Sequence, residues 1–280
     1  MKSSRSIQGE ALNTKIEVFK KQVWDYYKKN GRHDLPWRQP SLNLRSGKKD
    51  FNSYYILVSE IMLQQTQVCR VAEKYREFLK AFPTVQELAR SDLSTVLRVW
   101  SGMGYNRRGK YLRDAAKTIV EKYNGEVPRE RSDLRSLSGI GPYTASAIRI
   151  FAFDLPDTFI ETNVRAAYIH FLCESDSLNE NKSINDAQIV PLAIQAAEGQ
   201  DPRKWHWALM DYGSHLKKIH HNPSRKSAHY VRQSKFKGSL REVRGAILRK
   251  LQSSRGLTVR DLPFEKPRIN QAFSGLKRDG

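Results

Sequence analysis

Hydrophobic residues recur at intervals of three and four along most of the chain, the spacing that places side chains on one face of an α-helix. The clearest run lies between residues 58 and 79, where nine apolar positions fit one face of a single helix several turns long. Asn52 or Ser53 is placed to cap its start. Similar spacing follows in segments 82–100, 110–123, 128–153 and 155–172, whereas strand signals are few. The pattern therefore predicts an all-α fold.

The 280 residues are enough for one large domain or two modest ones. A composition shift near Ser234 predicts a main domain over residues 1–233 and a basic C-terminal extension over 234–280, whose helical spacing resembles a small helix-turn-helix unit. No apolar segment is long enough to span a bilayer, and the N-terminus lacks the apolar core of a secretory signal. Two cysteines, Cys69 and Cys173, suit a reducing compartment. We therefore expect a cytoplasmic, nucleoid-associated protein without a membrane partner.

The net charge narrows the choice of partner. The chain carries 49 Lys and Arg against 29 Asp and Glu, a formal charge of +20. The excess is concentrated from Asp201 to Gly280, where 19 basic and 6 acidic residues give +13. Such a charge favours a polyanion, because binding releases condensed counterions, and nucleic acid fits better than a membrane surface.

A polar stripe runs along the predicted helix at 58–79. Glu60, Gln64 and Gln67 share one face because residues three and four apart are neighbours on a helix. Taken alone, such a stripe is more often solvated or locally paired than catalytic. Whether Glu60 is a working acid depends on what the rest of the chain supplies.

Two further segments carry candidate chemistry. The turn LSGIGPYT (137–144) joins two predicted helices, and its backbone N–H groups at a helix start suit a DNA phosphate, although a plain helical hairpin fits equally well. Glu161 precedes a predicted helix with Asn163 close by, a position that favours the ionised carboxylate. In isolation Glu161 reads as an ordinary acid at a helix N-terminus, and Tyr143 as a core aromatic residue.

Together these segments resemble one family. The motifs SEIMLQQTQV, GMGYNRR, LSGIGPYTASAI and IETNVR occur in the order and approximate spacing of the helix-hairpin-helix DNA glycosylases related to endonuclease III. The chain is most similar to the adenine-DNA glycosylase branch, with LPWR at 35–38 as a further match. The resemblance covers residues 15–233 and implies the helix-hairpin-helix glycosylase fold, with two helical subdomains and the hairpin at about 131–150.

The resemblance also implies catalytic roles. Glu60 would be the general acid that protonates the departing purine, and Glu161, where the family has aspartate, would stabilise the oxocarbenium-like sugar. Asn163 and Tyr143 match residues that support that carboxylate. Because lyases of the superfamily have a lysine where this chain has Tyr143, the resemblance implies a monofunctional hydrolase.

Two further groups of residues follow from the resemblance. The first group would contact DNA, through a wedge inserted beside the extruded base and through the hairpin: Leu63, Gln64, Gln65, Thr66, Tyr105, Arg107, Arg108, Gly139 and Gly141. The second group would line the base pocket: His33, Leu35, Trp37 and Trp207. His33 and Trp207 stand where the family has hydrogen-bonding Arg and Glu or Gln, a change that weakens discrimination between bases.

The chain departs from the family at the iron–sulfur loop. The four cysteine positions fall on Lys217, Ser224, Ser227 and Gln233, none of which is a thiolate, so we expect no cluster and no other cofactor. The nearby histidines (His215, His220, His221 and His229) lack an accompanying acid or Cys, so basic-loop residues are favoured over a replacement metal site. We also expect no counterpart of the C-terminal domain that reads 8-oxoguanine in adenine glycosylases, because the short basic tail is too small to replace it in kind.

These observations predict a monomeric DNA glycosylase of base excision repair that acts on double-stranded DNA with a mismatched or damaged base. Adenine opposite guanine or 8-oxoguanine is the leading substrate. Two alternatives stay open: removal of thymine or uracil mispaired with guanine, and non-catalytic binding to damaged or distorted DNA.

Overall fold

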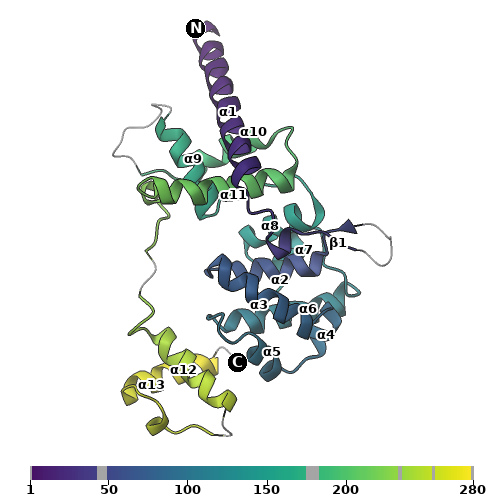
Figure 1. Ribbon diagram of the computed structural model, residues 1–280, viewed down its shortest axis with the longest axis vertical. Helices are drawn as coiled ribbons and strands as arrows, with labels where there is room; N and C mark the ends of the chain where they lie inside the picture. The colour runs from purple at the N-terminus through teal and green to yellow at the C-terminus, as the bar shows by residue number, and fades with distance from the viewer. Residues whose placement is uncertain (1, 43–48, 175–182, 233–234, 254–255, 279–280) are drawn as a thin grey trace. The chain divides into compact units, whose positions relative to one another are not determined.

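The computed structural model describes residues 2–42, 49–174, 183–232, 235–253 and 256–278 (Figure 1). These residues are helical apart from turns, loops and one short antiparallel pair, β1 (Ser41–Leu42) and β2 (Lys49–Asp50), so the all-α prediction is confirmed. No helix within these ranges is both long and apolar enough to cross a membrane. The chain divides into two compact units, residues 1–39 with 142–231, and residues 40–141 with 232–280.

The first unit is built on α9 and α11, which lie side by side (Figure 1). Phe19 of α1 is buried between these helices, with its ring 5.2 Å from Tyr168 and 6.3 Å from Trp205. Such aromatic contacts stabilise a core beyond the apolar area they bury. The elements of this unit are α1 (Lys2–Asn30), η1 (Pro36–Arg38), α8 (Pro142–Phe153), α9 (Thr162–Glu174), α10 (Asp186–Ala197), α11 (Pro202–Ile219) and η2 (Pro223–Lys226).

The second unit packs α4 and α5 against α6, and α2 against α3 and α6. Its core includes Leu88, Trp100 and Leu112, all fully buried. A capping box at Thr84 and Glu87 begins α4, because each side chain accepts the other residue's backbone N–H. The helices before the C-terminal extension are α2 (Ser53–Leu63), α3 (Val68–Ala81), α4 (Val85–Arg90), α5 (Leu93–Val99), α6 (Arg107–Lys122) and α7 (Arg131–Ser136).

The C-terminal extension forms its own small core. Helices α12 (Leu240–Ser253) and α13 (Lys266–Arg278) pack against each other, with η3 (Val259–Asp261) between them in sequence. The residues buried there are apolar: Val243, Ile247, Leu262, Ile269 and Ala272. The helical character predicted for this segment is therefore confirmed.

The single helix predicted over residues 58–79 is wrong. The chain forms α2 and α3, separated by the loop Gln64–Gln67, in which Gln65 has a φ of +57°. A left-handed residue cannot continue a right-handed helix, so the break is sharp. Apolar spacing did not reveal it because the buried residues of α3, Val71, Tyr75 and Phe78, continue the intervals of three and four residues. The predicted cap is confirmed, since Asn52 Oδ1 accepts the backbone N–H groups of Tyr54 and Tyr55.

Candidate active site

Glu60 is buried within α2. Only 4% of its surface is exposed, and its neighbours in the helix, Ile61 and Met62, are buried as well. Burying a carboxylate among apolar side chains is costly, so it is retained where the charge or the proton has a use. The reading of Glu60 as a solvated surface residue is therefore wrong, and the structure leaves it as a candidate acid.

The loop after α2 is held by Arg108. Its Nη1 donates to the carbonyls of Ile61, Met62 and Gln64, at 3.0, 2.9 and 2.6 Å. Its Nη2 donates to Thr66 Oγ1 at 2.8 Å and to the carbonyls of Met103 and Gly104. The last carbonyls of a helix lack partners within the helix, and Arg108 supplies them here. This side chain therefore connects the loop 64–67 to the loop 103–105.

The resemblance predicts that Arg108 contacts DNA, but in the structure this side chain is turned to the two loops. Its guanidinium is buried, and burial lowers its pKa to about 10, which leaves it charged at neutral pH. Arg107, by contrast, is exposed, with its guanidinium 5.4 Å from the ring of Tyr111. Of the two predicted arginines, Arg107 alone presents its charge to solvent.

The substitution Arg108→Met is expected to lower the free energy of unfolding by about 3 kcal/mol or more, because it leaves buried carbonyls without donors. Arg107→Met serves as the matched control and should change it by less than about 0.5 kcal/mol. Urea denaturation followed by circular dichroism measures both. Equal midpoints for the two variants would contradict the role assigned to Arg108.

The predicted wedge residues lie on the two loops that Arg108 connects. Tyr105 has a φ of +46° and an exposed fraction of 36%, and its ring lies 5.5 Å from the Arg108 guanidinium. Gln65 is exposed, while Leu63, Gln64 and Thr66 are half-buried. Non-glycine residues with positive φ are uncommon and concentrate at functional sites. Tyr105 and Gln65 therefore remain candidates for contact with a base.

The hairpin turn precedes α8, whose predicted start at Pro142 is confirmed. Gly139 has a φ of +78°, and a Cβ there would lie 2.9 Å from Tyr111 Cβ, so no larger residue fits without strain. Its carbonyl accepts a hydrogen bond from Gln64 Nε2 at 3.3 Å. Gly141 is exposed, with open space where its Cβ would be, so the backbone at the start of α8 is accessible to a partner.

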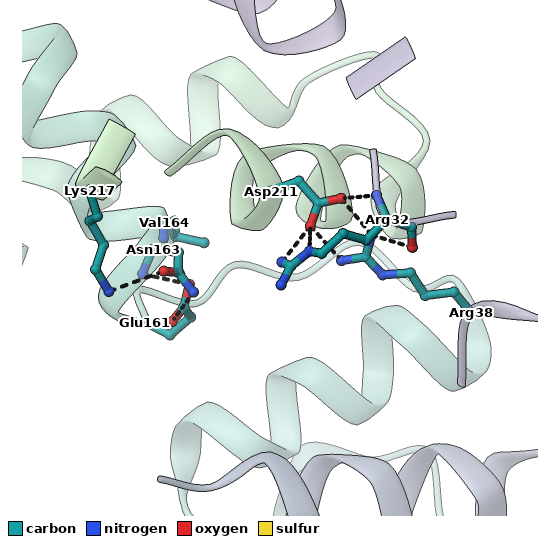
Figure 2. A network of polar contacts seen from close by, with 7 residues as sticks. All are labelled: Arg32, Arg38, Glu161, Asn163, Val164, Asp211 and Lys217. Carbon is teal, nitrogen blue, oxygen red and sulfur yellow. Dashed lines mark hydrogen bonds and ion pairs between the residues drawn. The ribbon is translucent and has the colours of Figure 1, made fainter. Parts of the chain in front are cut away.

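Glu161 immediately precedes α9 and binds its first turn. Its Oε1 accepts the backbone N–H groups of Asn163 and Val164, at 2.7 and 2.9 Å. Its Oε2 accepts from Asn163 Nδ2 at 3.3 Å, which confirms the predicted contact between these side chains (Figure 2). The carboxylate is thereby fixed at the positive end of the helix.

Burial and neighbouring donors act in opposite directions on the pKa of Glu161. Although the residue keeps part of its surface exposed, burial of the carboxylate raises its pKa above the ordinary value. The N–H groups of Val164 and Asn163 oppose this rise, as do the charges of Lys217 and Arg165. The ionised form of this carboxylate thus depends on these neighbours.

Tyr143 and the pocket candidates lie in aromatic surroundings. The ring of Tyr143 meets Phe159 edge-on at 4.9 Å, and Trp207 stacks on Phe151 at 5.8 Å. His33 lies 4.5 Å from the ring of Tyr27, and its Nε2 is 3.0 Å from the Tyr27 carbonyl oxygen. The other two pocket candidates follow in the same segment, with Trp37 buried and Leu35 half-buried.

A buried ion-pair network, which we call the Asp211 cluster (Arg32, Arg38 and Asp211), holds this segment against α11 (Figure 2). Arg38 donates to both carboxylate oxygens of Asp211, at 2.8 and 3.0 Å. Arg32 donates through its backbone N–H and its Nε, at 2.8 and 2.7 Å. Burial alone would raise the pKa of Asp211, but the two guanidinium groups outweigh it and lower the pKa.

The sequence analysis missed the Asp211 cluster. Its signal was an aspartate in an otherwise apolar stretch of α11 (ALMDYG), together with two arginines on either side of the predicted pocket residues. Arg38 also lies 5.3 Å over the ring of Trp207. The network therefore fixes the backbone that carries Leu35 and Trp37 and contacts a third pocket candidate.

The residues that stand at the positions of the family's cluster cysteines do not fit an iron–sulfur cluster. Lys217 donates to Thr162 Oγ1 and Asn163 Oδ1, at 3.3 and 3.2 Å, and Ser224 Oγ donates to the Thr162 carbonyl at 3.1 Å. Ser227 is buried, and Gln233 lies outside the described residues. In the part of the chain that is described, no group of three or more His, Cys, Asp or Glu side chains is placed to hold a metal ion.

A comparison with protein families identifies the helical framework that carries these residues. The family described as "HhH-GPD superfamily base excision DNA repair protein" matches residues 58–191. The chain contains an HhH-GPD domain. This domain includes Glu60, the hairpin glycines and Glu161.

Relatives of the HhH-GPD domain are named adenine DNA glycosylase. The chain is 35% identical over 205 residues to such a protein from Rattus norvegicus, covering 71% of this chain and 38% of the relative. It is 35% identical over 201 residues to another from Buchnera aphidicola subsp. Baizongia pistaciae, covering 70% of this chain and 52% of that protein. The matched part is thus about half or less of each relative's length.

Solved structures share the fold. A structure titled as a thermostable thymine-DNA glycosylase aligns with a TM-score of 0.62 and 24% identity, covering 78% of this chain and 94% of that chain. A non-covalent endonuclease III–DNA complex aligns with a TM-score of 0.54 and 17% identity, covering 74% and 86%. The predicted helix-hairpin-helix glycosylase fold is confirmed.

Proposed function

We propose that this protein is a monofunctional DNA glycosylase that hydrolyses the N-glycosidic bond of adenine opposite guanine or 8-oxoguanine. The observation that carries the proposal is the pair of carboxylates within an HhH-GPD domain, one buried in α2 and the other bound to the first turn of α9. The relatives named adenine DNA glycosylase support the choice of base.

The two carboxyl groups have different environments and suit different steps. Glu60 donates a proton to the purine as the bond between the base and sugar C1′ breaks, so the bond's electron pair leaves with a neutral base. Glu161, ionised, stabilises the positive charge that develops on the sugar. Water then adds to C1′ and loses a proton to a carboxylate. This division of tasks is the one that glycosidic bonds commonly require.

Tyr143 supports a hydrolase rather than a lyase. A phenol in the hairpin offers no amine for a Schiff base with the sugar. Its ring packs edge-on against Phe159, which holds it near the start of α8. We propose that the product is an intact strand with an abasic site.

We further propose that the substrate is double-stranded DNA, bound by a monomer. The net charge of +20 supports a polyanionic ligand, and the described residues provide exposed cations such as Arg107. Extruding the base needs an aromatic side chain to fill the gap, and Tyr105 is exposed in a left-handed conformation beside the loop 64–67.

We also propose that the enzyme works without an iron–sulfur cluster, because lysine and serine occupy three of the four expected ligand positions, and two of them, Lys217 and Ser224, bond to the α9 segment instead. Iron analysis of the purified protein and its visible absorbance test this point. Stoichiometric iron with cluster absorbance would refute it.

Single-turnover assays on duplexes with A·8-oxoguanine, A·G, T·G and U·G pairs, followed by hot alkali, test the substrate. Product from the two adenine duplexes alone is the expected result. Product only from T·G or U·G would show that the excised base is thymine or uracil and not adenine. Such a result would be compatible with His33 and Trp207, which stand where the family has other hydrogen-bonding residues. Tight binding without any product would refute an enzymatic role.

A further inference from the structure

Lys217 contacts the catalytic segment from a different helix. Its Nζ lies 3.2 Å from Asn163 Oδ1, 54 residues away in sequence (Figure 2). It also lies 3.3 Å from Thr162 Oγ1, 55 residues away. The family resemblance places a cluster cysteine at this position. The side chain in this chain is therefore a cation that donates to the residues next to Glu161.

The contact determines how the Asn163 amide is oriented. An ammonium group has only donors, so it binds the amide oxygen and not the amide nitrogen. With Oδ1 bound to Lys217, Nδ2 is directed to Glu161 Oε2 at 3.3 Å. Without the lysine, the amide could turn and place its oxygen against the carboxylate, which would repel it.

The backbone of the same segment is held by α11 and η2. A Cβ at Gly213 would lie 1.9 Å from the Asn163 carbonyl oxygen, so only glycine lets α11 approach this closely. Lys217 follows four residues later and therefore lies on the same helix face as Gly213. Ser224 Oγ donates to the Thr162 carbonyl at 3.1 Å. Close approach and hydrogen bonds together fix residues 161–163.

The charges near Glu161 also single out Lys217. Two cations act on Glu161, Lys217 from α11 and Arg165 from α9. Arg165 is engaged by Asp186, with Nε and Nη2 each 2.8 Å from a carboxylate oxygen, so much of its charge is offset. Within the described residues, Lys217 forms no ion pair with another acid. Its charge is therefore the more available one.

We propose that Lys217 is a positioning residue that orients Asn163 on Glu161 and keeps the Glu161 carboxylate ionised for the glycosylase reaction. The inference rests on the proposed function for its effect on the rate, but its effect on Glu161 can be measured without catalysis. Because burial raises the pKa of Glu161 and Lys217 opposes that rise, removal of the lysine raises it further.

The test compares Lys217→Met with Lys218→Met, the adjacent and exposed lysine, and with Lys217→Arg. Single-turnover rates on the A·8-oxoguanine duplex are measured from about pH 5 to about pH 9. Lys217→Met should move the acid limb of the profile up by about one pH unit and slow the reaction about tenfold at the acid end. Lys217→Arg should restore most of the rate, and Lys218→Met should match the wild type.

A second measurement separates this inference from the proposed function. Carbon-13 NMR of proteins labelled at glutamate carboxyls, with Glu161→Gln for assignment, gives the pKa of Glu161 directly. A higher pKa in Lys217→Met than in Lys218→Met supports the inference even if no duplex is cleaved. Equal pKa values and equal acid limbs in folded proteins, confirmed by thermal unfolding, would overturn it. An inactive wild type would refute the proposed function alone.

Discussion

Replacing Glu60 with glutamine is expected to reduce the single-turnover excision rate by about 10²- to 10⁴-fold, the usual contribution of a general acid. The amide has nearly the shape of the carboxyl group but no proton to give to the departing base. Glu60 is 4% exposed, so water does not readily take over its role. Product formation should therefore almost disappear, as measured by rapid quench and alkaline cleavage of an A·8-oxoguanine duplex.

DNA affinity should change little in Glu60→Gln, by less than about threefold, or about 0.7 kcal/mol. Fluorescence anisotropy with the same duplex measures it. Glu73→Gln on the exposed face of α3 is the matched control, because it removes one negative charge without touching the buried site. Full excision by Glu60→Gln would refute the acid assignment. A parallel loss of DNA binding would show that the carboxylate acts in binding instead.

Replacing Asp211 with asparagine is expected to lower the free energy of unfolding by about 3 to 5 kcal/mol, the usual cost of leaving a buried cation, here Arg38, without its partner. The side chains of Asp211 and Arg38 are 1% and 3% exposed, so solvent does not screen the loss. Because native proteins have only about 5 to 15 kcal/mol of stability, this change is large. Urea denaturation measures it, with Asp25→Asn, at an exposed residue of α1, as the control.

The effect of Asp211 depends on pH in a defined direction. Its pKa in the folded protein lies below the ordinary value of 3.8, so its stabilisation is present above that pH and is lost as the pH falls through the folded value. The stability difference between wild type and Asp211→Asn should therefore shrink in acid. A wild type and variant with equal urea midpoints at neutral pH would show that the cluster contributes nothing.

The Asp211 cluster also links stability to the residues predicted to line a base pocket. Arg38 adjoins Trp37 in sequence and lies over Trp207, so an unpaired Arg38 would disturb two predicted pocket residues. We expect Asp211→Asn to weaken discrimination among bases at temperatures where the variant is still folded. This arrangement gives a role to an aspartate that is buried in α11.

Local sequence signals predicted the local geometry well. Asn52 caps α2, Pro142 begins α8, and the Glu161 carboxylate accepts N–H groups at the start of α9. Each of these features depends on residues within about four positions of one another, where backbone geometry limits the arrangements. The motif spacing likewise predicted the HhH-GPD domain, whose residues 58–191 the family comparison matches.

Long-range contacts were not predictable in the same way. The motif predicts that Arg108 contacts DNA, yet the side chain is buried and donates hydrogen bonds to carbonyls 44 to 47 residues away in sequence. A periodic pattern shows which face of a helix is apolar but not which other element covers it. The break between α2 and α3 was missed for a related reason, since Arg108 of α6 donates to the Gln64 carbonyl and the Thr66 hydroxyl of the loop from 44 and 42 residues away.

The sequence by itself therefore determined the helical class, the domain family and the two candidate carboxylates, because composition, periodicity and short motifs carry that information. Only the tertiary structure decided which side chains hold Glu161 and the predicted pocket residues in place. Lys217 reaches Asn163, and Asp211 pairs with Arg32 and Arg38, across 54 to 179 residues of chain. Such pairs form when separate helices pack, and their energy depends on burial that no single segment possesses before folding.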